Sequence, residues 1–308
     1  MRGPDPCEHD DATDDVVQRS RRRTQQVRTV FLVTLALNAV VAVSKAGYSY
    51  FSGSLALGAD SLHSILDASS NVLALFSLHW AARPANSRHP YGLRKIEILG
   101  ALGIGMLIVI SLFEFASAAV MSLSGARRPP EINWAGFVVV LATMAINFVV
   151  TRYEHRKGHE LGSHLLCADA KHTESDLYAS GAVLLSFVAI RFGWAWADGL
   201  AALVLIVLVG RVAWLVFRDN VPILLDAAML DPGKVIELAR GVPGIQNIHH
   251  VRSRGIRSAI ELDLHMAVAA EMSVAEAHLL ASQIEQEVKQ KFPEVSDVII
   301  HVEPVTNQ

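Results

Sequence analysis

The chain has 308 residues, of which 52% are hydrophobic and 19% are charged, with a mean hydropathy of +0.34. Soluble domains carry about 25% charged residues, so this composition argues against an ordinary soluble protein. The formal net charge of −3 gives no indication of a nucleic-acid partner, and none is expected.

The N-terminal segment is polar, with an acidic run over 10–15 and then the basic run RSRRR. This composition predicts a disordered tail over 1–26 and no cleavable signal. Cys7 lies in this tail and Cys167 lies far from it in sequence. Neither has the spacing of a metal site or of a disulfide framework.

Six apolar stretches follow, each close to the ~20 residues that a bilayer-spanning helix needs. They are predicted over 29–51, 55–80, 96–123, 132–152, 165–190 and 195–217. Turn-forming segments such as YFSG and SGARRPPEIN separate them, and the fifth stretch begins with the polar segment LLCADAKHTESD. We therefore predict an all-α six-helix transmembrane domain over 27–218, embedded in a lipid bilayer.

Lysine and arginine residues near the ends of the spans predict the orientation. They concentrate in the N-terminal tail, between the second and third spans, and between the fourth and fifth spans. The opposite side has only Arg127, Arg128 and Arg191. Both termini of this multi-pass protein are therefore expected in the cytoplasm.

Two of the spans carry a matching pair of ionisable residues. The segment GADSLHSILDASSN contains His63 and Asp67, four residues apart and therefore on one helix face, and the fifth span repeats this spacing with His172 and Asp176. Ionisable residues inside a bilayer are costly and indicate function by default. The alternative is that they hold helices together through hydrogen bonds, but the repetition in two spans favours a site.

Two imidazoles and two carboxylates from facing helices would make a tetrahedral set of the kind Zn²⁺ prefers. The set lacks the thiolates of a copper(I) site and the all-oxygen shell of Mg²⁺ or Ca²⁺. Fe²⁺, Co²⁺, Mn²⁺ and Ni²⁺ accept the same donors. Asp60 and Asp169 each precede a histidine by three residues, and they fit ligation or a capping or outer-shell role equally.

From Arg218 onward the sequence has the character of a soluble domain. The predicted elements are a helix over 232–241, strands over 245–254 and 257–268, a helix over 273–292 and a strand over 296–303. IRSAIELDLHMAV alternates with the period of a half-buried strand, and Ser273 with Glu276 matches a capping box. This α-β-β-α-β order predicts a small α+β cytoplasmic domain over 219–308.

The six spans, the motifs ADSLHSILD, HPYGLRKIE and ADAKHTESD, and the tail domain together resemble the cation diffusion facilitator (CDF) family of metal/proton antiporters. The resemblance covers about residues 25–305. It implies a secondary active transporter of a bacterial inner membrane that exports a divalent metal, mostly zinc for this ligand set, in exchange for protons. The implied transport ligands are His63, Asp67, His172 and Asp176.

The resemblance also implies a metallochaperone-like tail domain that forms a homodimer and binds two Zn²⁺ ions. The matching positions are His249 or His250, His265, His278, His301 and Glu303. The family has an aspartate where Glu303 stands, so the carboxylate here is one methylene longer. The alternative for this domain is a set of scattered surface histidines.

Three histidines, His155, His159 and His164, lie between the fourth and fifth spans. They fit either a segment that feeds metal toward the membrane site or a solvated basic surface.

Two other functions remain as alternatives. An intramembrane metalloenzyme could use zinc to activate water, but the chain has no HExxH motif, and four protein ligands would close the position that a catalytic zinc keeps open. The chain is therefore not expected to be an enzyme. The other alternative is a membrane metal sensor that does not transport, and a flux measurement distinguishes it from a transporter.

Overall fold

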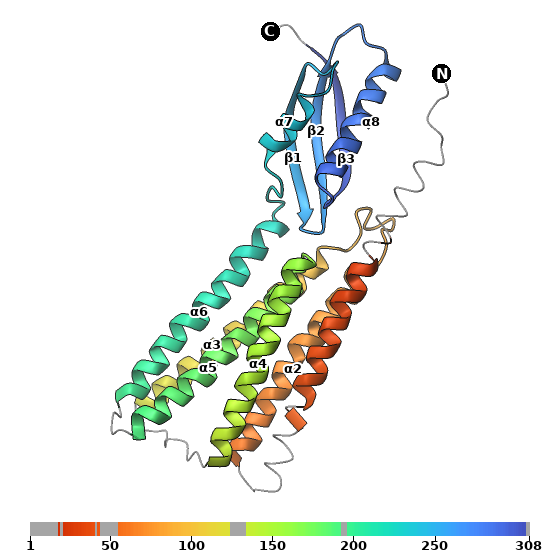
Figure 1. Cartoon of the computed structure of the whole chain (residues 1–308). Helices are drawn as coiled ribbons and strands as arrows, with labels where there is room; N and C mark the ends of the chain where they lie inside the picture. The colour runs from red at the N-terminus through yellow and green to blue at the C-terminus, as the bar shows by residue number, and fades with distance from the viewer. Residues whose placement is uncertain are drawn as a thin grey trace. The chain divides into compact units, whose positions relative to one another are not determined.

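The computed structural model describes residues 18, 21–40, 42–43, 55–123, 134–191 and 196–305 (Figure 1). Side chains are not described for parts of these ranges, 55–67 among them. The chain divides into two compact units, one over Val17–Val221 and one containing Pro222–Gln308.

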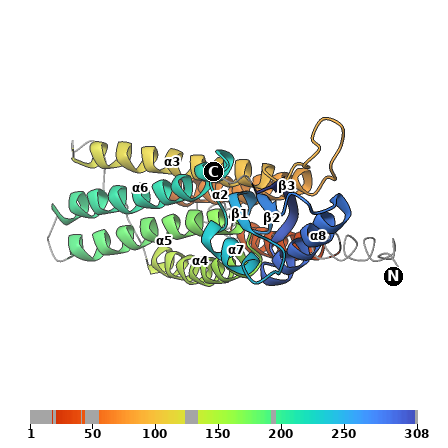
Figure 2. The same ribbon diagram turned by 90° about the horizontal axis from the view of Figure 1, so that it is seen from above.

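The first unit is helical. After the helical residues 21–40 and 42–43 come α2 (Leu55–Ala81), α3 (Ile96–Leu123), α4 (Trp134–Glu160), α5 (His164–Arg191) and α6 (Trp196–Leu224). The helices lie side by side, and successive helices run in opposite directions (Figures 1 and 2). Contacts join α2 to α3, α3 to α5, α4 to α5 and α2 to α5, so α5 is central to the helical unit.

An apolar core holds these helices together and leaves large apolar side chains on the outside. Phe31, Ile104 and Leu165 are fully buried in the core. In contrast, Phe113 of α3 is 77% exposed and Trp214 of α6 is 65% exposed. Apolar side chains that face outward, with ionisable side chains kept inside, are what a lipid environment favours.

The number of membrane spans is not confirmed. Among the described residues, one helical segment is long and apolar enough to cross a membrane by itself, Ile96–Ser117 within α3, with a mean hydropathy of 2.4. The polar first half of α5 is buried against its neighbours. Mean hydropathy depends on the composition of a segment and not on its burial. A helix whose polar side chains are buried against other helices can therefore have too low a mean hydropathy to qualify as a span.

Several helices extend beyond the predicted spans. Residues 21–26, assigned to a disordered tail from the sequence, are helical, and the predicted tail is therefore too long at this end. Helix α4 continues to Glu160, whose carboxylate pairs with Arg156 and Lys157 of the preceding turn at 2.7 Å each. Gly162, with a φ of 57°, then makes the turn into α5.

Helices α4 and α5 pack closely at Gly158 of α4. A Cβ atom added at Gly158 would lie 2.8 Å from Cys167 Sγ and 3.1 Å from the backbone nitrogen of Cys167. The backbone of α5 cannot move away locally, so a side chain here would push the two helices apart.

We therefore expect Gly158→Ala to destabilise the helical unit. Overpacking costs about 1–3 kcal/mol, against a gain of about 1 kcal/mol in helix propensity. Gly181→Ala is the matched control at the same helix pair, because a Cβ there would lie 3.9 Å from Met144 Cε. Thermal unfolding in detergent should show a lower midpoint for Gly158→Ala alone; an unchanged midpoint would contradict the close packing.

The second unit confirms the predicted element order. It contains α7 (Pro232–Ala239), β1 (Asn247–Ile256), β2 (Ala259–Val268), α8 (Val274–Lys291) and β3 (Val295–Pro304). The strands form a sheet in the order β1-β2-β3, with β1 antiparallel and β3 parallel to β2. Both helices cover the same face (Figures 1 and 2), where Leu262, Leu264 and Met266 are buried.

Local capping explains why the helices of this unit begin where they do. The Asp231 side chain accepts a hydrogen bond from the Gly233 amide at the start of α7. The capping box predicted at α8 is confirmed, with Ser273 and Glu276 bonded reciprocally. Hydrogen bonds from the Ser273 hydroxyl and amide lower the pKa of Glu276 below its ordinary value.

Candidate metal sites

His172 and Asp176 lie inside the helical unit. They are one turn apart on α5 and expose 4% and 8% of their surface. Neighbouring polar side chains on the same helix, including Asp169 and Ser175, are also buried. A polar helix segment can be buried in this way only if its side chains have partners or ligands.

His63 and Asp67 lie on α2, but their side chains are outside the described residues. The position of α2 relative to α5 is fixed by a contact nearby. The Ser70 hydroxyl of α2 donates a 2.7 Å hydrogen bond to Asp169 Oδ1 of α5. Both residues are buried, so this contact belongs to the interior of the helical unit.

The contact between Ser70 and Asp169 sets the register of the two antiparallel helices. Asp67 precedes Ser70 by three residues, and His172 follows Asp169 by three residues. His63 precedes Ser70 by seven residues, and Asp176 follows Asp169 by seven residues. Each residue adds about 1.5 Å along a helix. Asp67 is therefore level with His172, and His63 is level with Asp176.

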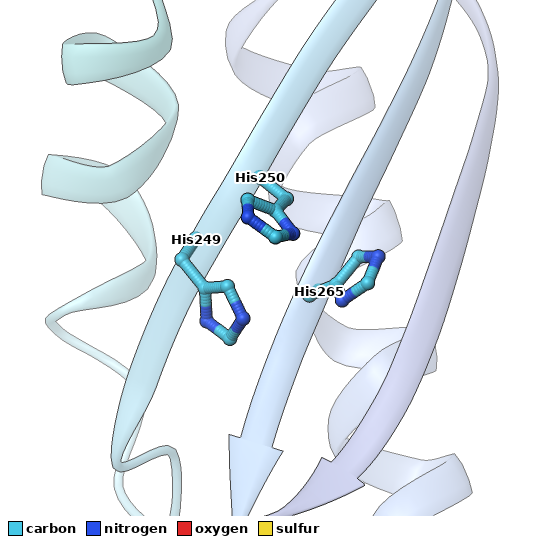
Figure 3. Close-up of side chains that lie close together, drawn as sticks. All are labelled: His249, His250 and His265. Atoms are coloured by element: carbon cyan, nitrogen blue, oxygen red, sulfur yellow. The ribbon is translucent and has the colours of Figure 1, made fainter.

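The second unit has a cluster of histidines on the sheet face opposite its helices. Figure 3 shows His249 and His250 of β1 and His265 of β2 facing a common space. Their ring centroids are 4.9–5.4 Å apart. Histidine nitrogens of the three residues lie within 4.8 Å of one another, which is compatible with one shared metal ion.

A second group adjoins the first through His265. It consists of His265, His301 and Glu303, with ligand atoms again within 4.8 Å of one another. Glu303 connects the two groups, since one carboxylate oxygen lies 2.9 Å from His249 Nε2 and the other lies 3.3 Å from His265 Nδ1. A carboxylate between two imidazoles is an arrangement that metal sites use.

The sequence predicted that either His249 or His250 is a metal ligand, and in the structure both lie in this cluster. The pairing of β1 with β2 is irregular between His249 and Arg252, and His250 has a φ of 50°. A β-bulge of this kind re-aims a side chain out of strict alternation. The two adjacent histidines in the sequence indicated a ligand at this point of the strand. The alternation of side chains along a strand does not show where a β-bulge lies, so the sequence could not indicate that both would face the cluster.

His278 is not brought to these groups within one chain. It lies on α8, which covers the other face of the sheet, and its side chain is exposed. Its assignment as a ligand stays a prediction that would require a second copy of the chain.

The three histidines between the fourth and fifth predicted spans are in helices. His155 and His159 lie on the last turns of α4 with exposed side chains and ring centroids 4.4 Å apart. His164 is the first residue of α5, is buried, and forms a 3.0 Å hydrogen bond between Nδ1 and Asn220 Oδ1. The described residues do not join these histidines in a three-ligand group.

Comparisons with known proteins agree with both units. The profile described as "Cation efflux transmembrane domain" matches residues 31–225, and "Cation efflux protein, cytoplasmic domain" matches residues 230–305. A "Probable cation efflux system protein" of Mycobacterium tuberculosis is 29% identical over 304 residues, covering 97% of this chain and 90% of that protein.

Two further relatives are similar to most of this chain, and one solved structure is similar to a part of it. Metal tolerance protein C1 of Arabidopsis thaliana is 30% identical, over 93% of this chain and 64% of its own length. The cation-efflux pump FieF of Citrobacter koseri is 28% identical, over 83% of this chain and 85% of its own. The manganese form of a MamM CTD is 23% identical, with a TM-score of 0.23, over 24% of this chain and 92% of its own.

Fold, buried polar residues and comparisons together define an integral membrane transporter of metal cations, and the chain is not an enzyme. It belongs to the cation efflux family. Membership confirms the predicted family and the predicted class of function, transport of metal cations.

Proposed function

We propose that this protein exports a divalent transition-metal cation, with Zn²⁺ first among the candidates, from the cytoplasm in exchange for protons. The cation passes through a tetrahedral site made by His63, Asp67, His172 and Asp176. The observation that carries the proposal is the register set by Ser70 and Asp169, because it supports a common level for the paired positions of α2 and α5.

The chemistry of the four side chains favours zinc. Two imidazole nitrogens and two carboxylate oxygens suit a small divalent ion that accepts tetrahedral coordination. Fe²⁺, Co²⁺, Mn²⁺ and Ni²⁺ are the competing cargoes, since the Irving–Williams order alone does not select zinc. Asp176 is buried on α5, and a nearby cation stabilises a carboxylate in such an environment.

Proton exchange follows from the same ligands. Metal ligands must be deprotonated, so a metal ion and protons compete for the site. Histidine, with an unperturbed pKa of about 6.5, can exchange a proton near neutral pH. Protons that enter from outside would displace the metal there, and loss of those protons toward the cytoplasm would restore the empty ligand set.

The test is metal flux in proteoliposomes that contain the full-length protein and a zinc-sensitive dye. We expect zinc to move in the direction that an imposed pH gradient drives, with either sign of gradient. A protein that binds zinc but gives no flux under any gradient would be a membrane metal sensor, and the transport proposal would be wrong.

We also infer that the second unit binds Zn²⁺ through His249, His265, His301 and Glu303, and forms a homodimer to which His278 could contribute from the partner copy. The fit is supported by Glu303, whose carboxylate lies against His249 and His265. His265 belongs to both three-residue groups, so it is the residue on which both depend.

Zinc should therefore stabilise the unit over 222–308, which has its own apolar core. Binding to the folded state alone gives about 2.7 kcal/mol at a hundredfold excess over Kd. We expect the increase in melting temperature with zinc to disappear in His265→Ala and to persist in Glu285→Gln, which changes a carboxylate paired with Lys289 on α8. A wild-type melting temperature that does not respond to zinc would exclude the site.

A further inference from the structure

Polar side chains from four helices meet in the interior of the helical unit. Thr34 comes from the helical residues 21–40, which we call the N-terminal helix. Ser70 and Asn71 come from α2, Glu154 from α4 and Asp169 from α5. None exposes more than 1% of its surface. We call these five residues the polar cluster.

Two hydrogen bonds join members of the polar cluster, and three of its four carboxyl oxygens have none among the described residues. Thr34 donates to Asn71 Oδ1 at 2.8 Å, and Ser70 donates to Asp169 Oδ1 at 2.7 Å. The Glu154 carboxyl lies beside the carboxyl of Asp169 and near the Thr34 hydroxyl. Neither Glu154 oxygen, nor Asp169 Oδ2, has a hydrogen bond of good geometry among the described residues.

Two buried carboxyl groups in contact cannot both be ionised without a large electrostatic cost. Among the described residues, the titratable groups that act on Glu154 and Asp169 are each other and His172 of α5. Among the side chains that the structure describes, the N-terminal helix and α2 contribute neutral groups here: Thr34, Ser70 and Asn71. One proton shared between the carboxyls would supply the missing hydrogen bond and remove the repulsion.

We propose that Glu154 and Asp169 form a proton-binding site that holds one proton between their carboxyl groups and gives it up when a metal ion enters the neighbouring transport site. The exchange role rests on the proposed function. When the metal enters, the carboxylic O–H bond breaks, the proton passes to water, and the additional carboxylate charge partly balances the incoming dication.

The location of the pair supports this coupling. Asp169 precedes His172 by one turn of α5, and its partner Ser70 follows Asp67 by one turn of α2. A helical turn is about 5.4 Å, and at that distance in a water-poor interior a dication acts strongly on a protonated pair. The chain thereby has a place for an exchanged proton besides the metal ligands themselves.

Infrared spectroscopy of the full-length protein in lipid tests the proton directly. At neutral pH we expect the C=O stretching band of a protonated carboxylic acid in wild type. It should be lost in Glu154→Gln, which keeps the shape of the side chain, and in Asp169→Asn. It should remain in the control Glu160→Gln, which changes an exposed carboxylate of α4 paired with Arg156 and Lys157.

Adding Zn²⁺ tests the coupling. The band should weaken in wild type, and a pH dye should record one proton fewer per bound zinc in Glu154→Gln than in wild type and Glu160→Gln. A wild-type spectrum without the band would overturn the inference, and equal proton release by all variants would overturn the exchange role. The band together with no metal flux would leave the proton site standing and refute the proposed transport, so the two failures are distinguishable.

Discussion

Replacing Asp176 with alanine should abolish metal transport while leaving the protein folded. We expect the pH-driven zinc flux in proteoliposomes to fall by at least about 100-fold, since loss even of groups that support metal ligands costs about 10–100-fold. The carboxylate is buried on α5, one turn from His172. Its removal takes a proposed ligand and a negative charge from the proposed site.

Asp176→Asn distinguishes the loss of the carboxylate from the loss of side-chain volume, because the amide keeps the size of the side chain without its charge. We expect the same loss of flux, and Asp67→Ala should behave as Asp176→Ala does. Glu160→Ala, on the exposed end of α4, should transport at the wild-type rate. Gel filtration and circular dichroism of each variant show whether fold and assembly persist. Near wild-type flux in Asp176→Asn and Asp67→Ala would mean that the metal site lies elsewhere.

The sequence predicted what depends on local pattern. The four-residue spacing of His172 and Asp176 predicted one helix face, and both residues are buried on α5. The alternation of β2 and the capping box of α8 predicted the fold of the second unit. These features depend on residues within a few positions of each other, where periodicity carries the information.

Contacts between distant segments could not be predicted in this way. Glu154 lies past the end of the predicted span 132–152, yet it is fully buried beside Asp169. Arg23 belonged by composition to a basic tail, yet it is bonded to α3. His250 reaches the histidine cluster through an irregular strand pairing. Each depends on tertiary packing, which overrides local preference.

Arg23 holds together the end of the helical unit where α4 turns into α5. Its guanidinium donates to both carboxylate oxygens of Glu97 at 3.0 Å, and to the carbonyls of Leu161 and Gly162 at 2.7 and 3.0 Å. The Glu97 side chain is 2% exposed. Its carboxylate also accepts hydrogen bonds from the Ser163 hydroxyl and the His164 amide, at 2.7 and 3.1 Å. The N-terminal helix, α3 and the start of α5 are therefore joined by one ion pair whose carboxylate is buried.

Arg23→Ala should destabilise the helical unit by about 3–5 kcal/mol, because it leaves the Glu97 carboxylate buried without its counter-charge. Arg156→Ala is the control: its ion pair with Glu160 has side chains 79% and 41% exposed, and a pair this exposed contributes little to stability. Denaturant unfolding in detergent measures both.

A double variant of Arg23 and Glu97 shows whether Arg23→Ala destabilises the protein through the lost ion pair or through other effects on the helix. If the cost in Arg23→Ala comes from the uncompensated carboxylate, adding Glu97→Gln should recover part of the lost free energy of unfolding, with a coupling energy of about 0.5–3 kcal/mol. The glutamine still accepts from Ser163 and His164 through its amide oxygen but carries no charge. Additive losses in the double variant would show that the guanidinium acts mainly through the carbonyls of the turn between α4 and α5, and that the charge on Glu97 is balanced by other groups.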